Sequence, residues 1–171
     1  HVCVYCDWHD DYVIEVGDEE PTRYVFHQVK SRNSSQGPWS FAHFFGVKMK
    51  RGAKQAKKAP AVSDDAIAPL MLLHHKNFSE SCEGVAFVTN AGITTDLETF
   101  IERLHEAATL EDLEADARIA FDHVARGYIE AEEPLAASSE ELFAWMRRIT
   151  VYKDKGNITD ETLALIEIGV R

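Results

Sequence analysis

The chain has 171 residues, a net charge of −11 and a hydrophobic share of 45%, which is ordinary for a soluble globular protein with one domain-sized core. Its longest apolar runs are far too short to span a bilayer, which excludes a membrane-spanning protein, and we expect no membrane partner. Three cysteines and the lack of a secretory signal favour the reducing cytoplasm over an exported, disulfide-linked protein.

The first thirty residues predict an antiparallel hairpin. Residues 11–16 and 23–30 are rich in β-branched and aromatic side chains, which is typical of strands. The residues between them, 17–22, have the composition of a turn. Residues 2–6 are a candidate for a further short strand.

A polar loop and a basic segment follow the hairpin. Residues 31–40 are polar and read as a loop, and residues 40–46 are short and aromatic-rich. Residues 47–60 hold few large apolar side chains, so we expect a mobile loop there. Six of the 18 basic residues of the chain lie in this segment: Lys48, Lys50, Arg51, Lys54, Lys57 and Lys58.

The middle of the chain predicts one helix and one buried strand. Ser63 is a suitable N-cap for a helix over residues 64–77, with two aspartates at its positive end. Residues 85–89 form a continuous apolar run that is closed by a turn. Such a run indicates a strand buried on both faces, as in a parallel sheet.

The last part of the chain reads as mainly helical. Helix N-terminal capping boxes are predicted at Thr95 with Glu98, at Thr109 with Asp112, and at Ser138 with Glu141. The helices they open are expected to end near Ala108, at Gly127 and near Arg148. Residues 149–153 are a candidate strand, and a last helix is expected from Thr159 to Arg171. The chain lacks an initiator Met and ends within this pattern, so we expect it to be part of a longer protein.

Three polar residues are expected to meet at one end of the hairpin. Gln28 and Lys30 point to the same side of their strand, because side chains alternate with a period of two. Closing the turn at residues 17–22 brings Asp11 near Gln28. A carboxylate, an amide oxygen and an ammonium group would then share one end of a sheet.

This set of groups suits phosphodiester hydrolysis. A hard divalent cation prefers oxygen ligands, which Asp11, the Gln28 side chain and the Val29 carbonyl can supply. Such a cation polarises a phosphate and lowers the pKa of a bound water. Lys30 would orient that water or stabilise the charge that develops on the phosphate. Asp10 remains an alternative to Asp11, and Glu15 is a candidate second ligand.

The order of these parts resembles the PD-(D/E)XK nuclease superfamily in its Gln-x-Lys form. Asp11 opens one strand and Gln28-Val29-Lys30 lies on the next. The run from His27 to Ser31, the loop ending in Trp39-Ser40, and Phe87-Val88-Thr89-Asn90 look like the double-stranded DNA endonuclease domain of bacterial anti-phage effectors. The resemblance covers residues 9–93 and loosely the helices beyond.

The resemblance implies a fold, a substrate and a cofactor. The fold is α/β, a restriction-endonuclease-like mixed sheet flanked by helices, with a nuclease core in residues 1–93 and a helical extension in residues 94–171. The implied activity is Mg²⁺-dependent cleavage of double-stranded DNA, with Mn²⁺ as a substitute. Such domains occur fused to cyclic-oligonucleotide sensors or beside HerA-type ATPases, and two-strand cleavage favours a homo-oligomer.

Two departures from the superfamily pattern accompany the resemblance. Gln28 replaces a carboxylate, so Asp11 alone charges the site. Members often add an acidic residue from a helix before the first motif strand, and only ten residues precede Asp11. We therefore expect the N-terminal part of the core to be missing from this sequence. A catalytically inactive module that binds DNA or a partner protein is the alternative function.

Several further residues are candidates for DNA contacts or metal binding. Ser31, Arg32 and the basic residues Lys54, Lys57 and Lys58 are candidates for phosphate contacts. Cys3-x-x-Cys6 has too few neighbouring ligands for structural zinc, so we expect ordinary thiols. His74 and His75 point to different faces of a helix, which makes them structural residues instead of a chelate.

Overall fold

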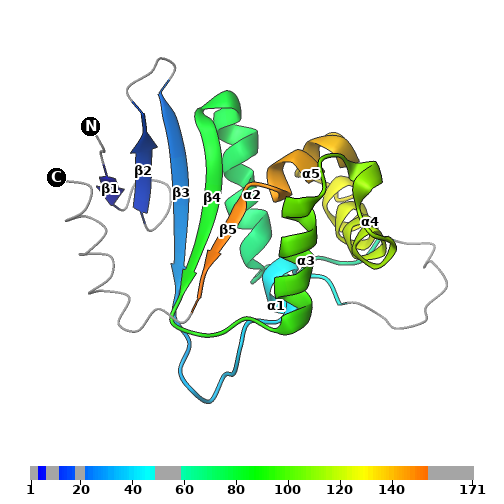
Figure 1. Cartoon of the computed structure of the whole chain (residues 1–171), viewed down its shortest axis with the longest axis horizontal. Helices are drawn as coiled ribbons and strands as arrows, with labels where there is room; N and C mark the ends of the chain where they lie inside the picture. The colour runs from blue at the N-terminus through cyan, green and yellow to red at the C-terminus, as the bar shows by residue number, and fades with distance from the viewer. Residues whose placement is uncertain (1–3, 7–11, 18–21, 49–58, 154–171) are drawn as a thin grey trace. The chain divides into compact units, whose positions relative to one another are not determined.

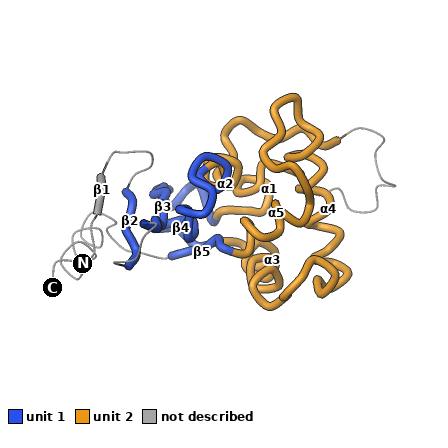
Figure 2. The backbone as a smooth tube through the Cα atoms, turned by 90° about the horizontal axis from the view of Figure 1, so that it is seen from above, with its two compact units in different colours: residues 1–38, 74–92, 148–171 blue, residues 39–73, 93–147 orange. Residues whose placement is uncertain are grey.

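The computed structural model describes residues 12–17, 22–48 and 59–153, together with the backbone of residues 4–6 (Figure 1). The chain divides into two compact units that interleave along the sequence (Figure 2). We call them the sheet unit, which comprises residues 1–38, 74–92 and 148–171, and the helical unit, which comprises residues 39–73 and 93–147.

The sheet unit contains a five-stranded mixed sheet in the order β1-β2-β3-β4-β5. The first three strands are antiparallel neighbours, while β4 runs parallel to both β3 and β5. The strands are β1 (Val4–Cys6), β2 (Tyr12–Val16), β3 (Arg23–Lys30), β4 (Cys82–Thr89) and β5 (Ile149–Tyr152). The predicted hairpin, the predicted buried parallel strand and the candidate strands at both ends are all confirmed.

The central strands are buried because their sequences are apolar. The residues of β4 from Gly84 to Thr89 are all buried, which agrees with the unbroken apolar run that predicted a parallel strand. In β3, Phe26 is fully buried. Its ring stacks on His74 at a centroid distance of 4.1 Å and packs against Phe78 at 4.8 Å. Both partners lie near the C-terminal end of α2 (Ile67–Phe78).

Helix α2 begins three residues later than predicted. Residues 64 and 65 form a turn, in which the Ala66 N–H donates to the Ser63 carbonyl at 3.1 Å. The two aspartates therefore precede the helix instead of forming its first turn. A short 3₁₀ turn, Ser79–Ser81, connects α2 to β4.

The helical unit is built around aromatic side chains. Rings of Phe41, Phe45 and Phe100 contact one another at centroid distances of 4.8 to 5.3 Å. The buried Tyr128 hydroxyl donates to the Phe45 carbonyl at 2.7 Å. The helices are α1 (Phe41–Phe45), α3 (Thr95–Glu106), α4 (Ala115–Ile129) and α5 (Ser139–Met146), with a 3₁₀ turn at Leu110–Asp112.

The capping predictions had mixed outcomes. Ser138 caps α5 as predicted, by accepting from the Glu141 N–H. The Thr109–Asp112 capping box is present, but it closes the 3₁₀ turn, and α4 starts only at Ala115. The Thr95 box is wrong, because Thr94 is the N-cap of α3 and makes no side-chain capping bond.

Two further predictions differ from the structure. Gly127 does not end its helix, because it is a buried residue within α4. The expected division at residue 93 also differs from the observed units, because β5 comes from beyond residue 94 and pairs with β4 inside the sheet. The predicted last helix, from Thr159, lies outside the described residues.

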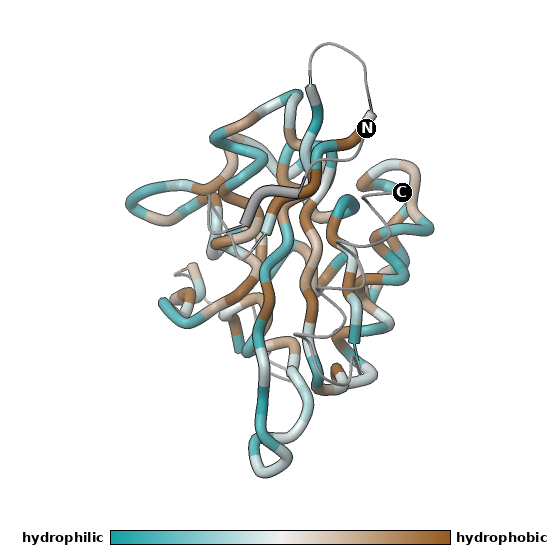
Figure 3. The backbone as a smooth tube through the Cα atoms, turned by 90° about the vertical axis from the view of Figure 1, so that its left-hand side faces the viewer, coloured by the Kyte–Doolittle hydropathy of each residue, from teal (hydrophilic) through white to brown (hydrophobic). Residues whose placement is uncertain are grey.

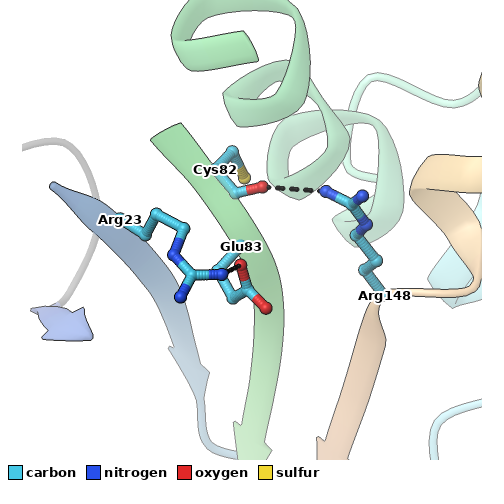
Figure 4. A network of polar contacts seen from close by, with 4 residues as sticks. All are labelled: Arg23, Cys82, Glu83 and Arg148. Carbon is cyan, nitrogen blue, oxygen red and sulfur yellow. Dashed lines mark hydrogen bonds and ion pairs between the residues drawn. The ribbon is translucent and has the colours of Figure 1, made fainter. Parts of the chain in front are cut away.

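An arginine network fastens the strands at the N-terminal ends of β3 and β4 (Figure 4). The Arg23 guanidinium pairs with the Glu83 carboxylate at 2.9 Å. Arg148, directly before β5, donates to the Cys82 carbonyl at 3.1 Å, and its own carbonyl accepts from the Val85 N–H at 3.1 Å. These contacts connect β3, β4 and β5 at the end of the sheet where the three strands begin.

The predicted fold class, an α/β protein with a restriction-endonuclease-like mixed sheet and helices, is confirmed. None of the helices in the described ranges has the length and apolar character needed to cross a membrane.

Candidate active site

The register of the β2–β3 hairpin determines which residues lie opposite each other. Tyr12 pairs with His27, and their rings stack at a centroid distance of 4.3 Å. Tyr12 directly follows Asp11, and His27 directly precedes Gln28. Asp11 lies outside the described residues, as does Asp10.

Gln28 and Lys30 share the face of β3 that carries Phe26. Side chains alternate along a strand, so positions 26, 28 and 30 form one row. Phe26 at the start of this row is buried against α2, whereas Gln28 and Lys30 are half-buried. The row therefore passes from the buried Phe26 to the half-buried polar residues Gln28 and Lys30.

The end of β3 is bonded to β4 beyond the point where its described pairing with β2 stops. Pairing with β2 is described up to His27, and pairing with β4 continues to Lys30, which lies opposite Thr89. Thr89 is fully buried, and its hydroxyl accepts from the Ala91 N–H at 3.2 Å. The strand that carries the candidate site is thus held from the β4 side.

Asn90 holds the chain that leaves the site. Its side-chain oxygen accepts from the Arg32 N–H at 2.8 Å, and its side-chain nitrogen donates to the Arg32 carbonyl at 3.0 Å. These two bonds resemble one more step of a ladder between β3 and β4. The sequence placed Asn90 in a stretch that resembles the endonuclease domain, but nothing in the local pattern relates it to a residue 58 positions earlier.

Arg32 uses its guanidinium within its own loop. One terminal nitrogen lies 3.2 Å from the Pro38 carbonyl, with the Gln36 and Gly37 carbonyls at 3.4 and 3.5 Å. Burial lowers the pKa of Arg32, while the group remains a cation. Arg32 therefore organises the loop, a role that the sequence-based expectation of a phosphate contact did not include. Ser31 is exposed beside it.

The acidic partners proposed from the sequence are not all at this end of the sheet. Glu15 lies opposite Tyr24, four residues before Gln28, which is about 13 Å along a strand. Within the described ranges, no group of three or more His, Cys, Asp or Glu side chains could hold a metal ion. Gln28 and Val29 carry oxygen atoms of the type that hard cations prefer.

Two buried titratable groups near α2 are structural. Burial, together with nearby Arg148 and His74, lowers the pKa of His75 to about 4. Burial raises the pKa of the Cys82 thiol to about 12. A neutral imidazole and an unreactive thiol are what a hydrophobic core requires, and the expected structural role of the His74-His75 pair agrees with their burial. The side chains of Cys3 and Cys6, and those of Lys54, Lys57 and Lys58, lie outside the described residues.

Comparison with known families shows to which family this chain belongs. Residues 1–144 match the family model described as Cap4, dsDNA endonuclease domain. The chain belongs to the Cap4 dsDNA endonuclease domain family. The Cap4 match includes β1 to β4 and the helices through most of α5, so it extends well beyond residue 93, where the sequence resemblance became loose. Searches of curated proteins and of solved structures gave no match.

Proposed function

We propose that the chain is a metal-dependent endonuclease that hydrolyses phosphodiester bonds of double-stranded DNA in bacterial anti-phage defence. The observation that carries the proposal is the Phe26–Gln28–Lys30 row at the end of a central strand, within a Cap4 endonuclease domain. An amide and an ammonium group in this position match the Gln-x-Lys form of the nuclease motif.

Asp11 would complete the site from the neighbouring strand. The register pairs Tyr12 with His27, and continuing the same register by one residue would bring Asp11 opposite Gln28. Directly opposed residues have Cβ atoms about 5 Å apart, so both oxygens could ligate one cation. The Val29 carbonyl is the third proposed ligand. Only Asp11 would carry a negative charge.

A bound Mg²⁺ would supply a Lewis acid and a water of lowered pKa, and Mn²⁺ would substitute for it. The task of Lys30 is to place a fixed positive charge where negative charge develops on the phosphate. Its strand is bonded to β4 up to Lys30 itself, which limits the freedom of the backbone that carries it. A preorganised cation stabilises a transition state without reorganisation during the reaction.

The assembly around this domain is also a proposal. Cutting both strands of a duplex needs two active sites, which favours a homo-oligomer. A fused sensor of cyclic oligonucleotides or a partner ATPase would supply the activating signal. The cytoplasm, where phage DNA arrives, is the compartment that suits this function.

A catalytically inactive DNA-binding module is the second candidate. The observation that favours it is the neutral Gln28 in a position where a carboxylate is usual, which leaves one charge for the metal. Plasmid cleavage with and without EDTA separates the two candidates. Loss of supercoiled plasmid only in the absence of EDTA supports the enzyme, and binding without cleavage in Mg²⁺ or Mn²⁺ supports the module.

The decisive variant is Lys30→Ala. Lys30 is half-buried at the end of β3, so truncation should preserve the fold, while the rate of plasmid nicking should fall to background. Lys76→Ala, which removes an exposed lysine from α2, is the matched control and should cleave like the wild type. Wild-type nicking by a folded Lys30→Ala protein would refute the assignment.

A further inference from the structure

The loop of residues 31–38, which directly follows Lys30, carries no acidic side chain. The chain has 29 acidic residues, yet none of them lies in residues 21–63, which include this loop. The loop extends beyond the ends of β3, β4 and β5 (Figure 1). It appears as a hydrophilic to neutral projection at the foot of Figure 3. An acidic protein that binds a polyanion needs such a surface, because carboxylates there would repel phosphates.

The loop is held in one conformation by its own hydrogen bonds. The Asn33 N–H donates to the Gln36 side-chain oxygen at 2.9 Å, and the Gln36 N–H donates to the Asn33 carbonyl at 3.1 Å. The Ser35 hydroxyl donates to the Asn33 side-chain oxygen at 2.6 Å. Asn90 and the Arg32 guanidinium fix the two ends, as described above. A loop of this kind loses little conformational entropy on binding.

These bonds use five of the eight backbone carbonyls of the loop as acceptors. The carbonyls of Arg32, Asn33, Gln36, Gly37 and Pro38 all accept from protein donors. The side-chain oxygen of Gln36 must accept, because its partner is a backbone N–H.

Two polar groups of the loop still have donors to offer. The Gln36 side-chain nitrogen has no hydrogen-bond partner among the described residues, and neither has the exposed Ser34 hydroxyl. A primary amide offers two N–H donors. The loop therefore presents N–H and O–H donors at Gln36 and Ser34. Its natural partner carries acceptors without donors, as phosphate oxygens do.

We propose that the loop of residues 31–38 binds the sugar–phosphate backbone of the duplex beside the scissile phosphate through neutral donors, chiefly the Gln36 amide. The inference rests on the proposed nuclease function and names the surface that the enzyme uses. Gln36 is six residues from Lys30, at most about 20 Å along an extended chain. Successive nucleotides are about 3.4 Å apart along a duplex, so Gln36 could contact a phosphate up to roughly six nucleotides from the cleaved bond.

The test replaces the donor nitrogen of the Gln36 amide with an acceptor oxygen and keeps the oxygen that accepts from the Asn33 N–H. Gln36→Glu keeps an oxygen for the Asn33 N–H but replaces the amide nitrogen with a second oxygen. Asn77→Asp is the matched control, since it makes the same change at an exposed position on α2. Affinity for a short fluorescent duplex is measured in EDTA, where metal-dependent cleavage cannot proceed. Single-turnover cleavage at saturating DNA is then measured in Mg²⁺.

We expect Gln36→Glu to weaken duplex binding by about tenfold or more, as for the loss of one hydrogen bond to a charged group. Asn77→Asp should change affinity by less than about twofold, because an isolated surface charge has little effect. Cleavage at saturating DNA should persist in both variants, because Lys30 is unchanged.

Equal affinities of wild type and Gln36→Glu would overturn the inference and leave the nuclease assignment intact. A similar loss in Asn77→Asp would also overturn it, since the effect would then be general repulsion. A wild-type protein that neither binds nor cuts duplex DNA would instead refute the proposed function.

Discussion

Asp11 is the residue on which the proposed metal binding most depends, because Gln28 contributes an oxygen without a charge. Asp11→Asn keeps the size and polarity of the side chain but removes its negative charge. Mg²⁺-dependent cleavage should be lost, and calorimetric titration should show weaker Mn²⁺ binding. Asp10→Asn is the control and should behave like the wild type. Unchanged Mn²⁺ binding in Asp11→Asn would transfer the ligand role to Asp10 or refute the proposed site.

His75 makes the stability of the fold sensitive to acid. Its pKa is about 4 in the folded protein and about 6.5 when exposed, so unfolding favours proton uptake. The contribution of His75 to stability is complete above pH 6.5, decreases as the pH falls towards 4, and amounts to about 3 kcal/mol. His75→Gln should therefore show a smaller decrease in unfolding free energy between pH 7 and 4.5, measured by urea titration. Parallel pH profiles of the two proteins would contradict this account.

Residues of the candidate site could be predicted from the sequence where the alternation of side chains along one strand sets their positions. Gln28 and Lys30 follow from the alternation of one strand. Asn90 and the structural role of Arg32 did not follow, because both depend on the parallel pairing of β3 with β4, which joins segments 58 residues apart. A single sequence contains no signal for that distance.

At the scale of elements, the cap of α5 provides a quantitative test. The Ser138 hydroxyl accepts from the Glu141 N–H at 3.1 Å, and the Glu141 carboxylate accepts from the Ala137 N–H at 2.7 Å. Ser138→Ala should lower the free energy of unfolding by about 1 kcal/mol. Ser139→Ala, one residue into the helix, should have a much smaller effect. Equal losses in chemical denaturation would show that the cap contributes no specific stabilisation.

Strands were predicted more accurately than helix boundaries, for a physical reason. Burial on both faces gave β4 an apolar run, and β3 was found with the bounds that its composition indicated. Helix starts depend on which of several polar residues adopts the capping geometry. Ser63 and Thr95 are as suitable in sequence as Ser138, but only tertiary packing distinguishes them.

At the scale of the whole molecule, the uneven distribution of charge matters more than the total of −11. We expect Lys54, Lys57 and Lys58 to contact phosphates irrespective of DNA sequence. Their joint replacement with Gln should weaken binding to all duplexes and flatten the slope of log affinity against log salt by up to about three units. Lys76→Gln should leave the slope unchanged. Identical slopes for the wild type and the triple variant would show that this segment is only solvated.

The organisation of the whole chain was the hardest feature to predict. The sequence suggested a core followed by helices, whereas the sheet unit takes its last strand, β5, from beyond the end of the helical unit. Four residues of β5 carry too weak a pattern to reveal which strand they pair with. Length and composition bounded the fold class, but the interleaving depends on contacts between distant segments.

The row formed by Phe26, Gln28 and Lys30 has an evolutionary consequence. Inserting or deleting one residue between Phe26 and Lys30 would leave composition and charge almost unchanged, yet it would turn the chemical groups to the opposite face of the sheet. Length variation among relatives should therefore be absent from this stretch and tolerated in the turn that precedes β3. We expect the spacing to be inherited as a unit, because the same alternation that buries Phe26 determines the side of the strand on which Lys30 lies.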